Sequence, residues 1–150
     1  MPPEDIPHIM HATTVALGEA GLLILGRAGA GKSGLALQLM AFGCALVADD
    51  RTAISRKGDA LIAHCPPAIT GLIEARGIGL LRADTQASCR LRLAVDLDQT
   101  ETERLPPERY LRLLDCDLPL VHNSASGHFA AALLQYLKAM SLPPNPETMS

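Results

Sequence analysis

One stretch of eight residues restricts what this chain can fold into more than any other part of it. Residues 26–33 fit the phosphate-binding pattern G-x-x-x-x-G-K-[ST] at every fixed position. An apolar run, Leu22–Leu25, precedes the stretch, and an amphipathic run, Lys32–Phe42, follows it. Strand, glycine-rich loop and helix in this order open a P-loop α/β domain, and the sequence predicts that architecture here. The loop consists of Gly26, Arg27, Ala28, Gly29, Ala30, Gly31, Lys32 and Ser33.

The residue types of this loop suit a nucleoside triphosphate with magnesium. Glycines let the backbone fold around phosphates so that successive N–H groups point inward, and the start of the helix adds the positive end of its dipole. Lys32 reaches the β- and γ-phosphates as a point charge, and the hydroxyl of Ser33 ligates Mg²⁺. The side chain of Arg27 is expected to point to solvent, although a phosphate contact stays open. The alternative, a glycine-rich turn that binds nothing, is disfavoured by the strand and helix on either side.

Two carboxylates end the next apolar run. Ala45–Ala48 predicts a buried strand, and Asp49 and Asp50 follow it directly. An aspartate at the end of a strand in a P-loop protein lies beside the Mg²⁺ and the γ-phosphate. Because neighbouring residues of a strand point to opposite faces, only one of the two can face the phosphates unless the strand has already ended and turned. A carboxylate here suits a base that accepts a hydroxyl proton, and the alternative is an ordinary polar strand end.

The other segments predict one α/β domain over residues 1–150, with a mixed sheet and flanking helices. Hairpins are expected around Gly18–Gly21 and Arg56–Asp59, Gly43 is expected to end the first helix, and a closing helix is expected over Phe129–Met140. Strands are expected over Thr13–Leu17, Leu22–Leu25, Ala45–Ala48, Thr52–Ser55, Ala60–His64, Leu72–Leu81 and Arg90–Leu97. Less regular structure is expected over Thr100–Asp117, as a loop or short helix, and over the proline-containing tails 1–7 and 142–150, as flexible chain.

Composition excludes several classes of protein. A length of 150 residues suffices for one core. The net charge of -3 and the absence of Trp argue against nucleic acid and anionic membranes as partners. No apolar run approaches the roughly 18 residues of a membrane span, so the expected compartment is a reducing cytoplasm. The cysteines lack a C-x-x-C pair, which argues against zinc and favours small buried hydrophobes; they are Cys44, Cys65, Cys89 and Cys116.

Four parts of the sequence together resemble the catalytic domain of bacterial HPr kinase/phosphorylase. They are His11, the P-loop, Leu46–Asp50 and Glu74–Gly79, and the resemblance extends over residues 8–82. The P-loop alone is generic, whereas a P-loop followed by Val-Ala-Asp-Asp and by Glu-x-Arg-Gly-x-Gly is specific. This resemblance implies a fold similar to phosphoenolpyruvate carboxykinase and the use of ATP with Mg²⁺ to phosphorylate a serine of HPr, a carrier protein of the phosphotransferase system. Many members also catalyse the reverse phosphorolysis, and this chain is similar to truncated members that lack the N-terminal domain.

The resemblance also implies roles for individual residues. Asp50 matches the aspartate that takes the serine proton, and Asp49 supports it or contacts the metal through water. His11 matches a histidine beside the active site, whereas on its own it reads as a surface or edge-strand histidine. Glu74 matches a glutamate assigned to Mg²⁺, with Arg76 as its partner; on their own, these two read as an ion pair on one face of a strand.

The sequence departs from the family in one later loop. Family members carry an arginine there, in a Pro-Gly-Arg-Asn setting that serves phosphorolysis and contacts between subunits, whereas residues 121–130 contain no arginine. His122 and His128 are weak substitutes, since neither offers a planar fork of donors. This departure argues against phosphorolysis and against the family's hexamer, and it leaves homo-oligomerisation open.

Two other functions stay open. A P-loop kinase of small molecules would need a lid with several arginines, and Arg104, Arg109 and Arg112 lie in a plausible place. A nucleotide-sensing module would bind ATP and a partner without transferring phosphate, and the missing arginine in residues 121–130 keeps that alternative open. The acceptor of a label from ATP distinguishes all three functions.

Overall fold

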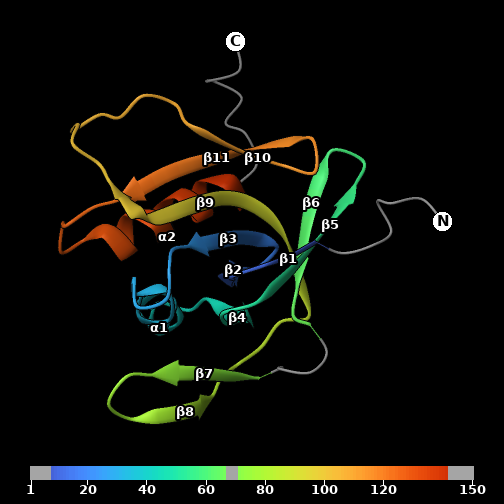
Figure 1. Cartoon of the computed structure of the whole chain (residues 1–150), viewed down its shortest axis with the longest axis vertical. Helices are drawn as coiled ribbons and strands as arrows, with labels where there is room; N and C mark the ends of the chain where they lie inside the picture. The colour runs from blue at the N-terminus through green and yellow to red at the C-terminus, as the bar shows by residue number, and fades with distance from the viewer. Residues whose placement is uncertain (1–7, 67–70, 142–150) are drawn as a thin grey trace.

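The computed structural model describes residues 8–66 and 71–141, which form a mixed sheet with two helices packed on one of its faces (Figure 1). The predicted α/β class is confirmed. Within these residues, neither helix is long and apolar enough to cross a membrane. The tails expected to be flexible, 1–7 and 142–150, lie outside the described residues.

The helices are α1 (Lys32–Ala41) and α2 (Phe129–Ser141). The strands are β1 (His8–Met10), β2 (Ala12–Leu17), β3 (Ala20–Leu25), β4 (Ala45–Ala48), β5 (Thr52–Lys57), β6 (Ala60–His64), β7 (Leu72–Ala75), β8 (Gly79–Arg82), β9 (Ser88–Thr100), β10 (Tyr110–Leu113) and β11 (Cys116–Asn123).

The strand order brings several strand ends to one edge of the sheet. The main path runs β1-β5-β6-β9-β3-β2-β4, and β11 pairs with β9. Strand β9 is parallel to both β3 and β11, whereas β2 is antiparallel to both β3 and β4. It follows that β3, β4, β9 and β11 all end at the edge where β2 begins. In sheets with parallel strands, this edge is the usual place for a ligand.

Strand β3, which leads into the P-loop, is buried on both faces. Leu22 and Ile24 belong to the core between the sheet and the two helices, where Leu35 and Leu39 of α1 pack. Leu23 points to a second core, which includes side chains of β5, β6, β10 and β11. A strand covered on both faces reads as a continuous apolar run. This double burial explains the unbroken apolar sequence before the P-loop and fixes the loop rigidly at the sheet edge.

Most predicted elements are confirmed. The two expected hairpins reverse at Gly18 and Gly58, whose φ angles are 61° and 62°. Gly43 takes a φ of 109° just beyond the end of α1, as predicted for the residue after a helix cap. Strand β9 is longer than the predicted strand at both ends.

The single strand predicted over 72–81 is wrong. That segment forms two short antiparallel strands, β7 and β8, in a sheet of their own, and Figure 1 shows this hairpin below the main sheet. Gly77 and Gly79, with φ angles of 86° and 132°, let the chain reverse between them. The alternation of apolar and polar residues is the same in one long strand and in two short ones, so the pattern alone could not separate them.

The loop or short helix predicted over 100–117 is correct only as far as residue 109. From Tyr110 the chain forms the antiparallel pair β10 and β11, neither of which was predicted. Their turn uses Leu114 and Asp115, with φ angles of 47° and 62°, in place of glycine. The usual sequence signal for a hairpin is therefore missing, and Pro119 inside β11 weakens the strand pattern further.

None of the four cysteines, all of which lie in the described part of the chain, forms a disulfide. Cys44 and Cys89 are buried as predicted, and burial raises the pKa of Cys89 to about 12. Cys65 and Cys116 are only half-buried, so their predicted burial is incomplete. No group of three or more His, Cys, Asp or Glu side chains in residues 8–66 and 71–141 is placed to hold a metal ion. The cysteines therefore act as core residues at two positions.

Candidate active site

The P-loop leaves β3 and enters α1 with an open inner face. Gly29 and Gly31 have φ angles of 84° and 104°, which glycine adopts without strain. A Cβ atom added to either residue would meet no atom within 4 Å, so the space beside the loop is free. At Gly26 the packing is tight instead, because an added Cβ would lie 2.9 Å from the Cβ of Ala30. Gly26 thus allows close packing at the start of the loop, whereas the space beside Gly29 and Gly31 leaves room for a ligand.

Lys32 places a buried cation against this loop. Its side chain is 7% exposed, and its Nζ donates to the carbonyl oxygens of Gly26 at 2.7 Å and Arg27 at 3.2 Å. None of the ion pairs among the described residues includes Lys32. The first helical bond of α1 runs from the N–H of Leu35 to Gly31, so the N–H groups before it have no partner in the helix. An uncompensated cation beside free N–H groups fits an anion such as a phosphate.

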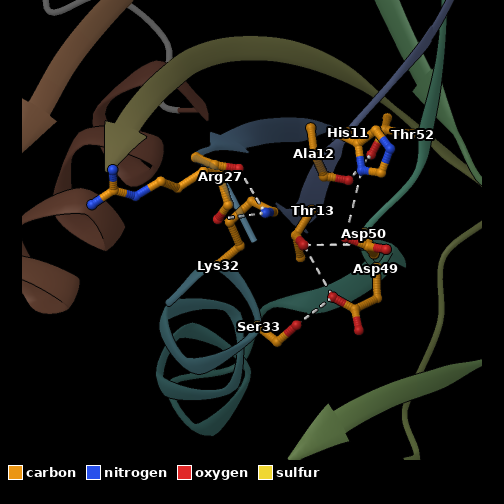
Figure 2. A network of polar contacts seen from close by, with 10 residues as sticks. His11, Ala12, Thr13, Arg27, Lys32, Ser33, Asp49, Asp50 and Thr52 are labelled. Carbon is orange, nitrogen blue, oxygen red and sulfur yellow. Dashed lines mark hydrogen bonds and ion pairs between the residues drawn. The ribbon is translucent and has the colours of Figure 1, made fainter. Parts of the chain in front are cut away.

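Asp49 connects the P-loop to β2 and β7, and Figure 2 shows its bonds to Ser33 and Thr13. Its Oδ1 accepts hydrogen bonds from Ser33 Oγ at 2.7 Å and Thr13 Oγ1 at 3.0 Å. Its Oδ2 accepts from the backbone N–H of Glu74 at 3.2 Å. A hydroxyl and a carboxylate in contact suit Mg²⁺, which proteins hold through one or two carboxylates while substrate phosphates supply further ligands. The donor set at Ser33 and Asp49 therefore fits a magnesium ion bound together with a triphosphate.

Asp50 lies beside Asp49 because the strand has ended. Its φ angle of 65° turns the chain, and β4 stops at Ala48. The backbone N–H of Asp50 donates to Thr13 Oγ1 at 3.1 Å, and its Oδ1 lies 3.9 Å from Nδ1 of His11. Its side chain is 65% exposed. The turn thus puts both carboxylates at one site, where Asp49 is hydrogen-bonded and Asp50 is open to solvent. This is the arrangement expected if the strand ends before the two aspartates.

Other predicted residues lie at the margin of this site. The backbone N–H of Arg27 donates to both carboxylate oxygens of Asp98, and its side chain is 86% exposed, as expected for a solvent-facing residue (Figure 2). Glu74 is exposed on β7 and approaches Asp49 through its backbone. Arg76 lies in the turn after β7, and the ion pairs found among the described residues do not join it to Glu74. The expected pair is therefore not formed here.

The two histidines of residues 121–130 have other neighbours than the P-loop lysine and Asp49. His122 lines a cavity between β9, β11 and α2, next to Tyr136. His128 exchanges a hydrogen bond between its Nδ1 and Ser126 Oγ at 2.8 Å. Among the described residues, neither ring forms a hydrogen bond or ion pair with Lys32 or Asp49.

Sequence reasoning missed the threonines of β2. Thr13 and Thr14 are both fully buried, and Thr14 Oγ1 lies 2.9 Å from Thr52 Oγ1, which in turn donates to the carbonyl of Ala12. Thr13 joins both aspartates, through the side chain of Asp49 and the backbone of Asp50. The signal was present, since two adjacent threonines interrupt an apolar strand, but their partners lie 36 to 38 residues away.

Replacing Thr13 by valine is expected to lower the free energy of unfolding by about 1–3 kcal/mol, because the N–H of Asp50 then loses its acceptor and Asp49 Oδ1 loses one of its donors. Valine keeps the shape, so the loss reports the hydroxyl alone. Urea denaturation measures it, with Thr85→Val as the control at an exposed threonine, where a change within about 0.5 kcal/mol is expected. Equal stabilities of the Thr13→Val variant and the unmodified protein would show that the hydroxyl does not hold the turn at Asp50.

Comparisons with known proteins agree with this geometry. The family described as HPr Serine kinase C-terminal domain matches residues 6–119. A protein of Cupriavidus metallidurans named HPr kinase/phosphorylase is 36% identical over 139 residues, which cover 84% of this chain and 43% of that protein. A protein of the same name from Bordetella petrii is 43% identical over 98 residues, or 57% of this chain and 32% of that protein. The chain thus spans less than half the length of these curated relatives.

A solved structure has the same fold. The structure of the Hpr(Ser) kinase/phosphatase from Coxiella burnetii superposes with a TM-score of 0.72 at 24% identity, and the match covers 89% of this chain and 90% of that one. The expected likeness to this fold is therefore confirmed.

Proposed function

The chain belongs to the family of the HPr serine kinase C-terminal domain, and on this premise we propose that it transfers the γ-phosphoryl group of ATP to a serine of an HPr-like phosphocarrier protein. The observation that carries the proposal is the pair of adjacent carboxylates, of which Asp49 is bound to the P-loop hydroxyl of Ser33 while Asp50 stays open to solvent. A kinase needs both, because one carboxylate belongs with the metal and the other must meet the acceptor.

The P-loop would hold the phosphates of ATP. Lys32 is close enough to the loop to turn its charge from the carbonyls of Gly26 and Arg27 to the β- and γ-phosphates. The free N–H groups at the start of α1 would bind the phosphate oxygens. Ser33 and Asp49 would hold Mg²⁺, with Glu74 as a further predicted ligand from β7. When bound, Mg²⁺ neutralises charge on the phosphates.

Asp50 would act as the base toward the acceptor. The serine O–H bond breaks as its proton passes to the Asp50 carboxylate, the oxygen forms a bond to the γ-phosphorus, and the bond to the β-phosphate oxygen breaks to release ADP. Thr13 fixes the backbone of Asp50, and His11 lies where it can orient the carboxylate or contact the acceptor. Electrostatic positioning by fixed groups would supply most of the acceleration.

Two of the three arginines that suggested the rival small-molecule kinase form ion pairs instead. Arg109 pairs with Glu101 at 3.1 Å and Arg112 pairs with Asp117 at 2.9 Å. Arginines held in such pairs are not free to close over a phosphate as a lid. We also propose that the reverse phosphorolysis is weak, since no arginine stands in residues 121–130.

A transfer assay tests the proposal. The protein is incubated with Mg²⁺ and ATP labelled at the γ-phosphate, together with an HPr-like acceptor and, separately, with the same acceptor whose target serine is changed to alanine. Label on the first acceptor alone is the expected result. Tight ATP binding without label on any acceptor would identify a nucleotide-sensing module instead, and added inorganic phosphate measures the reverse reaction.

A further inference from the structure

A second cavity adjoins the P-loop on the side away from the two aspartates. Its volume is about 360 Å³, which lies within the range of small-ligand sites. It lies at the sheet edge where β9 and β11 end, opens to solvent, and is bordered on one side by the start of α2. Its lining includes Gly31 from the P-loop, Gly34 and Gln38 from α1, Leu97 from β9, Asn123 from β11 and Phe129 from α2.

The position of this cavity relative to α1 indicates how a nucleotide would be oriented on the P-loop. Ser33 contacts Asp49 on one flank of the helix start, whereas Gly34 and Gln38 line the cavity on another flank. Residues four apart share one face of a helix, and consecutive residues lie about 100° apart around it. A triphosphate across the loop that reacts beside Asp49 therefore has its other end directed toward Gly34 and the cavity.

The polar groups of the cavity suit a base. The side-chain amides of Gln38 and Asn123 have no hydrogen-bond partner among the residues that the structure describes. Each amide offers donors and an acceptor together. Leu97 and Phe129 provide apolar wall on which a flat ring can pack. The lining is thus mostly polar, with an apolar patch at Leu97 and Phe129, and it offers a heterocyclic ring two free amides to bond and a surface to pack on.

The same lining favours adenine over guanine. An amide donates to N7 of adenine and accepts from its N6 amino group at the same time, whereas N7 and O6 of guanine both accept and are read by Arg or Lys. No charged side chain is found among the described residues around this cavity. If guanine were bound instead, the amide oxygen would face guanine O6, and the two acceptors would repel each other. The described residues around the cavity include no cation to offset this repulsion.

We propose that this cavity is the nucleoside subsite and that Gln38 and Asn123 select adenine in it. The inference rests on the proposed use of ATP and extends it to the groups that recognise the base. Both residues are binding residues of this subsite and lie apart from Asp50, so their replacement is expected to change nucleotide selection and leave phosphate binding intact.

Calorimetric titration of the whole chain with the Mg²⁺ complexes of ATP, GTP and inorganic tripolyphosphate tests the proposal. ATP is expected to bind about tenfold more tightly than GTP. Gln38→Ala and Asn123→Ala are each expected to remove most of that preference by weakening ATP, with the affinity for tripolyphosphate unchanged. Gln135→Ala provides the matched control, because Gln135 is also an exposed helical glutamine but lies on α2 outside the cavity lining.

The outcomes separate this inference from the proposed function. The subsite assignment is wrong if both variants keep the preference of the unmodified protein for ATP. It is also wrong if their affinity for tripolyphosphate falls as much as their affinity for ATP. In both cases the kinase proposal stands. If the preference follows Gln38 and Asn123 but no acceptor is phosphorylated, the subsite stands and the kinase proposal falls. If none of the three ligands binds, both are overturned.

Discussion

Replacing Asp50 by asparagine is expected to slow phosphoryl transfer by about 10²- to 10⁴-fold, the usual contribution of a positioned general base. The affinity for Mg·ATP is expected to stay nearly constant, because Asp49 and not Asp50 contacts the P-loop serine. Asparagine also tolerates the φ of 65° at this position, so the turn is kept. Single-turnover transfer to the acceptor measures the first effect, and calorimetric titration with Mg·ATP measures the second.

Asp115→Asn is a close control for this substitution. Asp115 is another exposed aspartate with a positive φ, 62°, but it lies in the turn between β10 and β11. Its replacement therefore repeats the same chemical and conformational change away from the site. A normal transfer rate in the Asp50→Asn variant would mean that another group, or the substrate itself, accepts the proton.

The parts of the site that could be predicted from the sequence are those that lie close together along the chain. The P-loop is one contiguous segment, and its glycines encode its backbone conformation locally. Asp49 and Asp50 could be placed beside it because one helix and one buried strand separate them from Ser33, and this unit has a narrow range of geometries. The hydrogen bond between Ser33 and Asp49 is the consequence.

The parts that could not be predicted depend on strand order. Strand β2 precedes the P-loop in sequence but lies between β3 and β4 in the sheet, and this insertion puts Thr13 against Asp49 and Asp50. A sequence pattern shows that a strand is buried without showing its neighbours. The cavity beside the P-loop could not be predicted either, because its lining includes Asn123 at the end of β11, a strand that was not predicted. The role of Glu74 stays a prediction, because its contact with Asp49 uses the backbone.

Replacing Lys32 by methionine is expected to weaken both ATP binding and transfer. Methionine keeps the apolar stem as far as Cε but lacks Nζ and with it the charge that would meet the β- and γ-phosphates. Loss of one such electrostatic contact is expected to lower the transfer rate by about 10²- to 10³-fold. Lys57→Met is the control, because Lys57 is an exposed lysine at the end of β5, next to the hairpin turn. ATP affinity and transfer by the Lys32→Met variant that equal those of the unmodified protein would show that the P-loop does not hold the phosphates.

The stability of the Lys32→Met variant is expected to change in a different way from its activity. Lys32 is buried, and its Nζ bonds to the carbonyls of Gly26 and Arg27 and to no other group in residues 8–66 and 71–141. Removing the charge relieves its desolvation but leaves two carbonyls without their donor, and these opposing contributions are each of the order of 1–3 kcal/mol. Urea denaturation without nucleotide is therefore expected to show a small net change beside the large loss of transfer. Asp50→Asn is expected to separate transfer from binding, and Lys32→Met is expected to separate both from folding, because the two opposing contributions to stability nearly cancel.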